Sequence, residues 1–187
     1  MKATGIVRRI DDLGRVVIPK EIRRTMRIRE GDPLEIYTDR EGEVIFKKYS
    51  PIGELASFAA QYAETLHKTC SLSVVICDRD AVIACAGVPK KEYAEHSLSD
   101  ELEAVIESRS LYMYREENGG EKIYVTQDGT SHYVSCAMPI LSEGDIIGCV
   151  ASVLPAGEDK KADSTGTDIE SKLILTAAGF LGKQLES

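Results

Sequence analysis

The sequence has no apolar run that approaches the roughly 20 residues needed to span a membrane. Residues 1–9 also lack the apolar stretch of a secretory signal. With 43% hydrophobic and 29% charged residues, the composition is that of a folded globular protein rather than a disordered one. We therefore expect a cytoplasmic protein with no membrane partner.

Signatures of a metal site are also missing. The five cysteines are odd in number and no two are spaced as C-x-x-C, so neither a zinc site nor a disulfide framework is predicted. We expect all of them to be small apolar residues buried in the C-terminal part of the chain: Cys70, Cys77, Cys85, Cys136 and Cys149. His67, His96 and His132 are isolated, without metal-ligand spacing. No metal and no cofactor is expected.

Catalytic motifs are missing too. The sequence contains no P-loop, no G-x-S-x-G and no H-E-x-x-H. Residues 179–183 have the glycines and the lysine of a phosphate-binding loop, but they fall within an amphipathic helical pattern, and core packing explains them better. Ser131 and His132 are neighbours in sequence, which does not provide the geometry of a catalytic triad. An enzyme is therefore not predicted.

Charge divides the chain into two parts. The net charge of −8 argues by itself against binding nucleic acid. Residues 1–50, however, carry 12 Lys and Arg against 9 Asp and Glu, a net charge of +3, whereas residues 51–187 carry 11 against 22, a net charge of −11. This asymmetry indicates a basic N-terminal domain (1–50) and an acidic C-terminal domain (51–187).

The N-terminal domain is predicted to be rich in β-structure. Four strands are expected, at residues 4–10, 15–18, 34–37 and 43–49. One short helix is expected at 20–25, with Pro19 at its first position. A chain of about 50 residues without disulfides or metal rarely buries enough surface alone. We therefore expect a homodimer of intertwined strands.

The C-terminal domain is predicted to be α+β. Ser50 and Pro51 favour the start of one helix, Ser99 favours the start of another, and a capping box at 167–170 indicates the start of the last. Strands are expected at residues 72–78, 81–86, 111–114, 123–125, 132–141 and 146–154. The resulting architecture is an antiparallel sheet flanked by helices that gather on one side.

Arginines of the N-terminal domain are the candidate functional residues. Five are candidates for contacts with DNA: Arg8, Arg9, Arg15, Arg23 and Arg24. A guanidinium donates two hydrogen bonds at once to phosphate oxygens or guanine edges, and neutralised phosphates release counterions. The alternative is a solvated surface on which these arginines pair with acidic neighbours such as Asp11 and Glu21. No predicted helix is long enough for a helix-turn-helix.

The motif D-x-L-G-R-V-V-I-P at residues 11–19, within the similar segment 2–25, resembles the AbrB-type swapped-hairpin DNA-binding domain. The resemblance covers about the first fifty residues. It implies an all-β swapped-hairpin barrel, formed by an intertwined homodimer with one short helix per chain, whose arginines face double-stranded DNA. Arg8, Arg15, Arg23 and Arg24 match family positions, and Arg9 matches a position that is basic in the family.

The whole chain is similar to a member of this family in which a GAF domain follows the AbrB-type domain. That resemblance implies a transcription regulator, activator or repressor, of forespore gene expression during sporulation, associated with the nucleoid. It also implies a homotetramer assembled through residues 51–187. Recognition of DNA shape, with a preference for A·T-rich promoters, is expected beside base contacts.

The resemblance to GAF domains also implies that a small ligand binds over one face of the sheet. Six polar residues are candidates for lining that pocket: Arg79, Tyr112, Tyr114, Tyr124, Ser131 and His132. The alternative is a domain that only oligomerises. An antitoxin that binds a protein partner is the alternative for the whole chain, because swapped-hairpin proteins also serve in toxin–antitoxin pairs. Antitoxins usually end in a short flexible segment, however, and not in a domain of this size.

Overall fold

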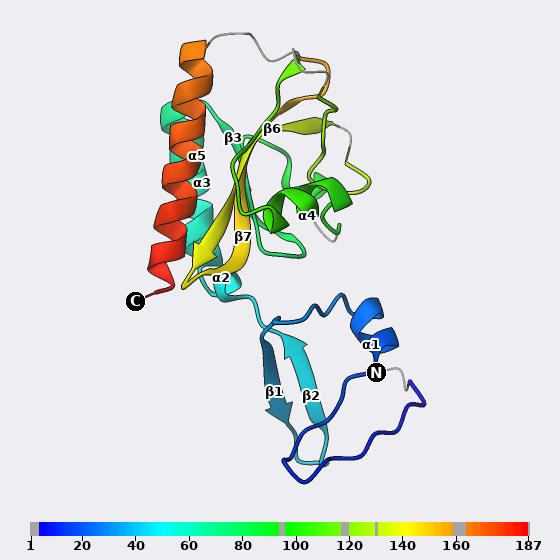
Figure 1. The fold of residues 1–187 in the computed structure, drawn as a ribbon. Helices are drawn as coiled ribbons and strands as arrows, with labels where there is room; N and C mark the ends of the chain where they lie inside the picture. Colours follow the sequence, from blue (N-terminus) through cyan, green and yellow to red (C-terminus); the bar gives the residue numbers. More distant parts are fainter. Residues whose placement is uncertain (1–3, 94–95, 117–119, 130, 159–163, 187) are drawn as a thin grey trace. The chain divides into compact units, whose positions relative to one another are not determined.

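The structure of the protein is a computed structural model that describes residues 4–93, 96–116, 120–129, 131–158 and 164–186. The chain divides into two compact units, Met1–Tyr49 and Ser50–Ser187 (Figure 1). In the described ranges, no helix combines the length and the hydropathy needed to cross a membrane.

The first unit contains a short helix and a β-hairpin. The helix α1 spans Lys20–Thr25. Pro19 is its N-cap residue, whereas the prediction placed Pro19 at the first helical position. The strands β1 (Leu34–Thr38) and β2 (Val44–Lys48) pair antiparallel. Asp39 closes their turn, because its Oδ1 accepts hydrogen bonds from two backbone N–H groups. The predicted helix and this hairpin are confirmed.

The predicted strands at 4–10 and 15–18 are absent from the single chain. Both segments lie outside any helix or strand, and their apolar side chains are exposed, Val7 by 83% and Val17 by 73%. A β-strand exists only where a neighbouring strand supplies hydrogen-bond partners. Within one chain β1 and β2 pair with each other alone, so these two segments have no ladder to join.

The second unit is built on a five-stranded antiparallel sheet with the order β4–β3–β7–β6–β5. Its strands are β3 (Ser73–Cys77), β4 (Val82–Ala86), β5 (Tyr112–Met113), β6 (His132–Ser142) and β7 (Asp145–Pro155). A 3₁₀ turn, η1 (Lys90–Glu92), follows β4. The predicted strand at 123–125 is wrong. The backbone hydrogen bonds of this segment go to separate partners, and only a single bridge joins Tyr124 to Tyr133.

Helices cover both faces of the sheet, which corrects the prediction that they gather on one side (Figure 1). The helices α2 (Pro51–Glu54), α3 (Ala56–Cys70) and α5 (Ser164–Gln184) pack on one face, and α4 (Asp100–Glu107) packs on the other. The reason lies in β7, where all residues from 147 to 153 are buried. Because neighbouring residues of a strand face opposite sides, such a run needs cover on both.

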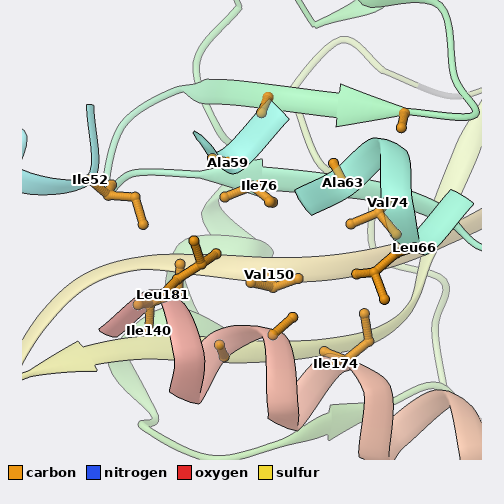
Figure 2. Packing of buried hydrophobic residues seen from close by; sticks show 14 of the residues in the cluster. Ile52, Ala59, Ala63, Leu66, Val74, Ile76, Ile140, Val150, Ile174 and Leu181 are labelled. Atoms are coloured by element: carbon orange, nitrogen blue, oxygen red, sulfur yellow. The ribbon is translucent and has the colours of Figure 1, made fainter. Parts of the chain in front are cut away.

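The larger core lies between the sheet and the three helices on the first face. Ile52 and Leu66 from the α2–α3 side meet Ile174 and Leu181 of α5 over strand residues such as Ile76 (Figure 2). The caps predicted at Ser50 and Ser99 are confirmed, since each side chain accepts a hydrogen bond from the backbone N–H three residues later.

A glycine sets the distance between α5 and β6. A Cβ atom at Gly182 would lie 2.1 Å from the carbonyl oxygen of Leu141, so only glycine permits this close approach. Residues 179–183 are thus helical, as predicted, and within them Leu181 and Gly182 are buried against the sheet, whereas Gly179, Phe180 and Lys183 are exposed.

The predicted capping box at 167–170 is wrong, because α5 begins earlier, at Ser164. Glu170 therefore lies inside the helix, where it is only 9% exposed. Its Oε1 accepts a hydrogen bond from the hydroxyl of Ser152 on β7 at 2.6 Å. In a capping box, the glutamate would accept a hydrogen bond from a backbone N–H at the start of the helix. Here the carboxylate of Glu170 accepts from the hydroxyl of Ser152 on the sheet instead.

Four of the five cysteines are buried as predicted, in the second unit: Cys77, Cys85, Cys136 and Cys149. Cys70 is exposed, which corrects the prediction, because it is the last residue of α3 and lies beyond the apolar stripe of that helix. Cys77 and Cys149 are direct cross-strand partners on β3 and β7. The thiol of Cys149 and the burial of the site raise the pKa of Cys77 well above its ordinary value.

Candidate nucleic-acid interface

All five predicted DNA-contacting arginines are exposed in the first unit: Arg8, Arg9, Arg15, Arg23 and Arg24. Arg8 and Arg9 lie in the segment before Asp11. Nη1 of Arg8 donates to the carbonyl oxygen of its neighbour Val7, at 3.1 Å. Arg23 and Arg24 lie in the last turn of α1. The first unit thus presents its guanidinium groups to solvent on short segments.

Arg15 is held by Asp11 in a closed turn. Oδ1 of Asp11 accepts from the backbone N–H of Leu13 at 3.0 Å and of Arg15 at 2.8 Å, and Oδ2 accepts from Nε of Arg15 at 2.8 Å. Gly14 makes the turn possible with a φ of +76°. The backbone N–H and then the guanidinium of Arg15 lower the pKa of Asp11 below its ordinary 3.8.

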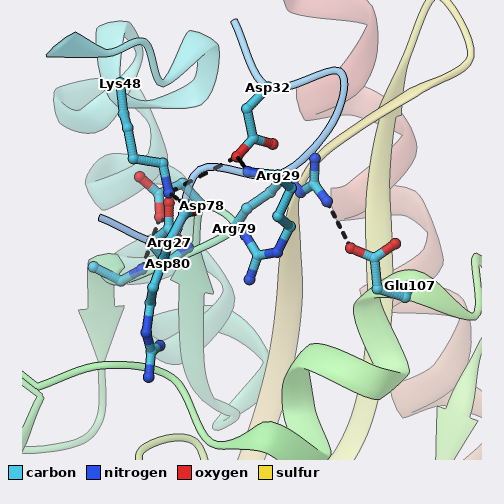
Figure 3. A network of polar contacts seen from close by, with 9 residues as sticks. Arg27, Arg29, Asp32, Lys48, Asp78, Arg79, Asp80 and Glu107 are labelled. Atoms are coloured by element: carbon cyan, nitrogen blue, oxygen red, sulfur yellow. Dashed lines mark hydrogen bonds and ion pairs between the residues drawn. The ribbon is translucent and has the colours of Figure 1, made fainter. Parts of the chain in front are cut away.

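The loop after α1 is tied to the hairpin by contacts that the sequence analysis missed. Nζ of Lys48 on β2 donates to the carbonyl oxygen of Arg27 at 2.7 Å and lies 3.9 Å from Oδ2 of Asp32 (Figure 3). The same Asp32 oxygen accepts from the backbone N–H of Arg29 at 2.7 Å. Lys48 lies 16 residues after Asp32, a separation that matches no helix or strand period. The sequence alone therefore does not predict this pair.

Large apolar side chains are unusually exposed in this unit. In the described residues before Ser50, twelve of them are exposed: Ile6, Val7, Ile10, Leu13, Val16, Val17, Met26, Ile36, Tyr37, Val44, Phe46 and Tyr49. Among the described residues of the much longer second unit, three are exposed, Ile169, Leu175 and Phe180. So much apolar surface on a unit of about 50 residues is typical of an interface.

The six predicted pocket residues have partners of several kinds. Arg79 makes an ion pair with Glu107 at 2.6 Å (Figure 3). Tyr114 is buried and packs edge-on against Tyr133, with ring centroids 5.0 Å apart, and the backbone carbonyl of Tyr124 accepts from the hydroxyl of Ser99. Tyr112 is half-buried on β5, where burial and then the nearby Tyr114 raise its pKa.

Ser131 and His132 do come together, around a residue that the sequence analysis missed. The hydroxyl of Ser131 donates to Oε2 of Glu92, and Nδ1 of His132 lies 3.0 Å from the same hydroxyl and 3.4 Å from the same carboxylate oxygen. Both contacts of the imidazole use the same ring nitrogen, Nδ1, whereas a catalytic relay uses the two ring nitrogens for different partners.

Three hydroxyl groups of the second unit are buried without a hydrogen-bond partner in the described residues: Tyr93, Thr126 and Ser135. Burial is the main reason that the pKa of Tyr93 is raised. No sequence pattern reveals them, because a buried Ser, Thr or Tyr looks the same in the sequence whether or not its hydroxyl has a hydrogen-bond partner. In the same described part of the chain, no three potential metal ligands gather.

Comparisons with known proteins cover both units. A family model described as "Stage V sporulation protein T C-terminal, transcription factor" matches residues 54–186. One described as "Antidote-toxin recognition MazE, bacterial antitoxin" matches residues 7–53. Over 187 residues the chain is 51% identical to stage V sporulation protein T of Bacillus subtilis strain 168, covering 100% of this chain and 99% of that protein. The chain belongs to the stage V sporulation protein T family.

The family assignment agrees with the similarity of the first unit to a second regulator. Over 51 residues the chain is 65% identical to the transition state regulatory protein AbrB of the same organism, which is 27% of this chain and 52% of that protein. The AbrB-type N-terminal domain predicted from residues 11–19 is thereby confirmed, and the chain is a member of a transcription factor family.

Solved structures resemble the second unit. A methyl-accepting chemotaxis protein, residues 122 to 287, matches 71% of this chain and 91% of its own with a TM-score of 0.51 at 18% identity, which shows the fold alone. The GAF domain/HD domain protein from Geobacter sulfurreducens matches 73% of this chain and 95% of its own, with a TM-score of 0.46 at 17% identity. The C-terminal unit of this sporulation protein T family member thus shares its fold with that fragment of the chemotaxis protein.

Proposed function

We propose that this chain binds double-stranded promoter DNA through its N-terminal unit and regulates forespore gene expression during sporulation, in the cytoplasm and on the nucleoid. The main support is the 51% identity over the full chain to stage V sporulation protein T. The first unit is 65% identical to AbrB, whose N-terminal domain is described as a DNA recognition domain, and this also supports DNA binding.

The DNA contacts are assigned to the five exposed arginines: Arg8, Arg9, Arg15, Arg23 and Arg24. In a homodimer each appears twice, so ten guanidinium groups become available for phosphates and base edges. Neutralised phosphates release counterions, which supplies sequence-independent affinity. The helix α1 has six residues, too few to read a major groove as a recognition helix does, so A·T-rich sequences are preferred through their shape.

The first unit is the site of homodimerisation in this proposal. The twelve exposed apolar side chains need cover, and the segments 4–10 and 15–18 need strand partners. A second copy supplies both at once. Substituting Val17, which is 73% exposed, by Asp tests this. In native mass spectrometry the full-length variant is expected to fall from the tetramer proposed below to a dimer held by the second unit, whereas Arg40→Asp, in the hairpin turn, is expected to stay tetrameric.

The second unit assembles dimers into a tetramer in this proposal. Phe58 and Tyr62 of α3 lie against Phe180 of α5, at centroid distances of 5.9 and 5.7 Å, and Phe180 remains 41% exposed. The exposed Ile169, about three turns before Phe180, extends this apolar face along α5. Wild-type chain is expected at about 82 kDa, four times 20.5 kDa. Phe180→Asp should give dimers, and Gln61→Asp, at an exposed position on α3, should stay tetrameric.

Sensing of a small ligand is the second candidate role of this unit. The three buried hydroxyls without partners favour it, because an unsatisfied buried polar group costs about 1–3 kcal/mol unless water or a ligand satisfies it. A metabolite that occupies the site should raise the melting temperature of the wild-type chain and do so less for Thr126→Val. If no metabolite in a broad screen shifts the melting temperature, the unit only oligomerises.

Binding to a protein partner as an antitoxin does is the alternative for the first unit, and the match of residues 7–53 to an antitoxin family model favours it. The DNA-binding proposal predicts that the chain purified from its native host contains no second protein in stoichiometric amount. A small toxin held in a fixed ratio through native mass spectrometry would support the alternative.

A further inference from the structure

The carboxylate of Asp11 uses its two oxygens for different tasks. Oδ1 holds the backbone of the turn through the N–H groups of Leu13 and Arg15, and the backbone N–H of Asp11 in return donates to the carbonyl oxygen of Arg15 at 3.1 Å. Oδ2 instead holds the side chain of Arg15 through Nε. One substitution can therefore separate the two tasks.

The contact with Nε leaves the outer part of the guanidinium available. A guanidinium has five N–H donors, one on Nε and four on the two Nη atoms. In the described residues neither Nη atom of Arg15 has a hydrogen-bond partner, and the side chain is 69% exposed. Two Nη groups that point to solvent from a fixed plane match two neighbouring acceptors on one base edge, of which O6 and N7 of guanine are the usual partners.

We propose that Asp11 is a positioning residue for DNA recognition, which fixes the plane of the Arg15 guanidinium so that its two Nη groups read a base edge. The inference rests on the proposed DNA-binding function. A side chain that is already ordered loses less conformational freedom on binding. This favours the two hydrogen bonds to a base edge, which need a fixed geometry, over contacts with phosphates, which do not. The negative charge of Asp11 also weakens purely electrostatic binding, so Asp11 raises specificity rather than affinity.

Asp11→Asn isolates the side-chain contact. The amide oxygen of Asn can still accept from the two backbone N–H groups, but its NH₂ group cannot accept from Nε of Arg15. Asp12→Asn is the matched control, because it removes the same charge one residue away without touching that contact. Circular dichroism of the full-length variants at the temperature of the binding experiment should match that of the wild type.

Binding is measured by fluorescence anisotropy with two duplexes: one selected in vitro by the wild-type chain for tight binding, and one with the same bases scrambled. Both Asn variants should bind the scrambled duplex more tightly and to a similar extent, since each removes one negative charge. Only Asp11→Asn should lower the ratio of selected to scrambled affinity, by about three- to tenfold. In an Arg15→Ala background, Asp11→Asn should leave the ratio unchanged, because Asp11 acts through Arg15.

Two results would overturn the inference. One is an equal ratio for Asp11→Asn and Asp12→Asn in the otherwise wild-type chain. The other is a loss caused by Asp11→Asn that persists in the Arg15→Ala background, which would mean that the aspartate acts on the turn and not through the guanidinium. A wild-type chain that shows no salt-dependent affinity for either duplex would instead reject the proposed function, and this inference with it.

Discussion

Ser152 and Glu170 join the sheet to the C-terminal helix: the hydroxyl of Ser152 on β7 donates to Oε1 of Glu170 on α5 at 2.6 Å, and the two residues are 2% and 9% exposed. A buried carboxylate needs hydrogen-bond donors, because burying a polar group without a partner is costly. The contact therefore adds a directional hydrogen bond to the apolar contacts that pack α5 on the sheet.

Replacing Ser152 by Ala should lower the free energy of unfolding of the second unit by about 1–3 kcal/mol, because it removes a donor from a buried carboxylate. Ser135→Ala is the matched control. Ser135 is equally buried, but its hydroxyl has no partner in the described residues, so its loss should change stability little or raise it. Urea unfolding followed by circular dichroism measures both, and equal losses for the two variants would contradict the role of the contact.

Two glycines of α5 should respond to alanine in opposite directions. Gly182→Ala should destabilise the unit by about 1–3 kcal/mol, because the new Cβ would meet the carbonyl of Leu141 at 2.1 Å. A Cβ at Gly179 would meet nothing within 4 Å, so Gly179→Ala should stabilise the helix by about 0.5–1 kcal/mol. The same unfolding experiment compares them, and a neutral Gly182→Ala would show that α5 does not lie this close to β6.

The cysteines should react with a thiol reagent in two classes. In the folded chain near pH 8, only Cys70 should react rapidly, because the other four are buried and the pKa values of Cys77 and Cys85 are raised. Ellman's reagent should thus release about one equivalent from the native wild type, none quickly from Cys70→Ser, and five from the denatured chain. Rapid reaction of a second native thiol would show that one of the two cores of the sheet is open to solvent.

The carboxyl of Asp11 should titrate below pH 3.8 in the folded chain. Because its pKa is lower in the folded state than in the unfolded one, the turn contributes stability above pH 3.8 that is lost as the pH falls through the folded-state pKa. Arg15→Ala removes the guanidinium but keeps the backbone N–H, so the pKa should rise only part of the way back. Carboxyl NMR titration checks this, with Arg8→Ala as a control that should leave Asp11 unchanged.

Local signals in the sequence predicted the local structure well. The caps at Ser50 and Ser99, the helix α1 and the hairpin at Asp39 each depend on residues within a few positions of one another. The failures involve tertiary partners. The capping box at 167–170 has the right residues, but Ser152 from a distant strand takes the carboxylate.

Long-range pairing also decided which parts of the candidate site could be predicted. The motif at 11–19 was enough to identify the domain and its arginines, because the characteristic residues of that domain lie close together in the sequence. The strands expected at 4–10 and 15–18 need partners that one chain does not supply. Glu92, which meets Ser131 and His132, is about 40 residues away from them in sequence, and no spacing rule could have placed it there.

Salt-dependent DNA binding tests the central claim most directly. Affinity of the full chain for an A·T-rich promoter duplex is measured by fluorescence anisotropy across a salt series, beside Arg23→Ala/Arg24→Ala and the charge-matched control Lys90→Ala/Lys91→Ala in η1. The account predicts a steep loss of affinity with salt, a slope flattened by roughly 0.9 for each lost phosphate contact in the arginine variant, and no change of slope in the control. Equal slopes for the wild type and the arginine variant would show that α1 is a solvated surface and not part of the DNA interface.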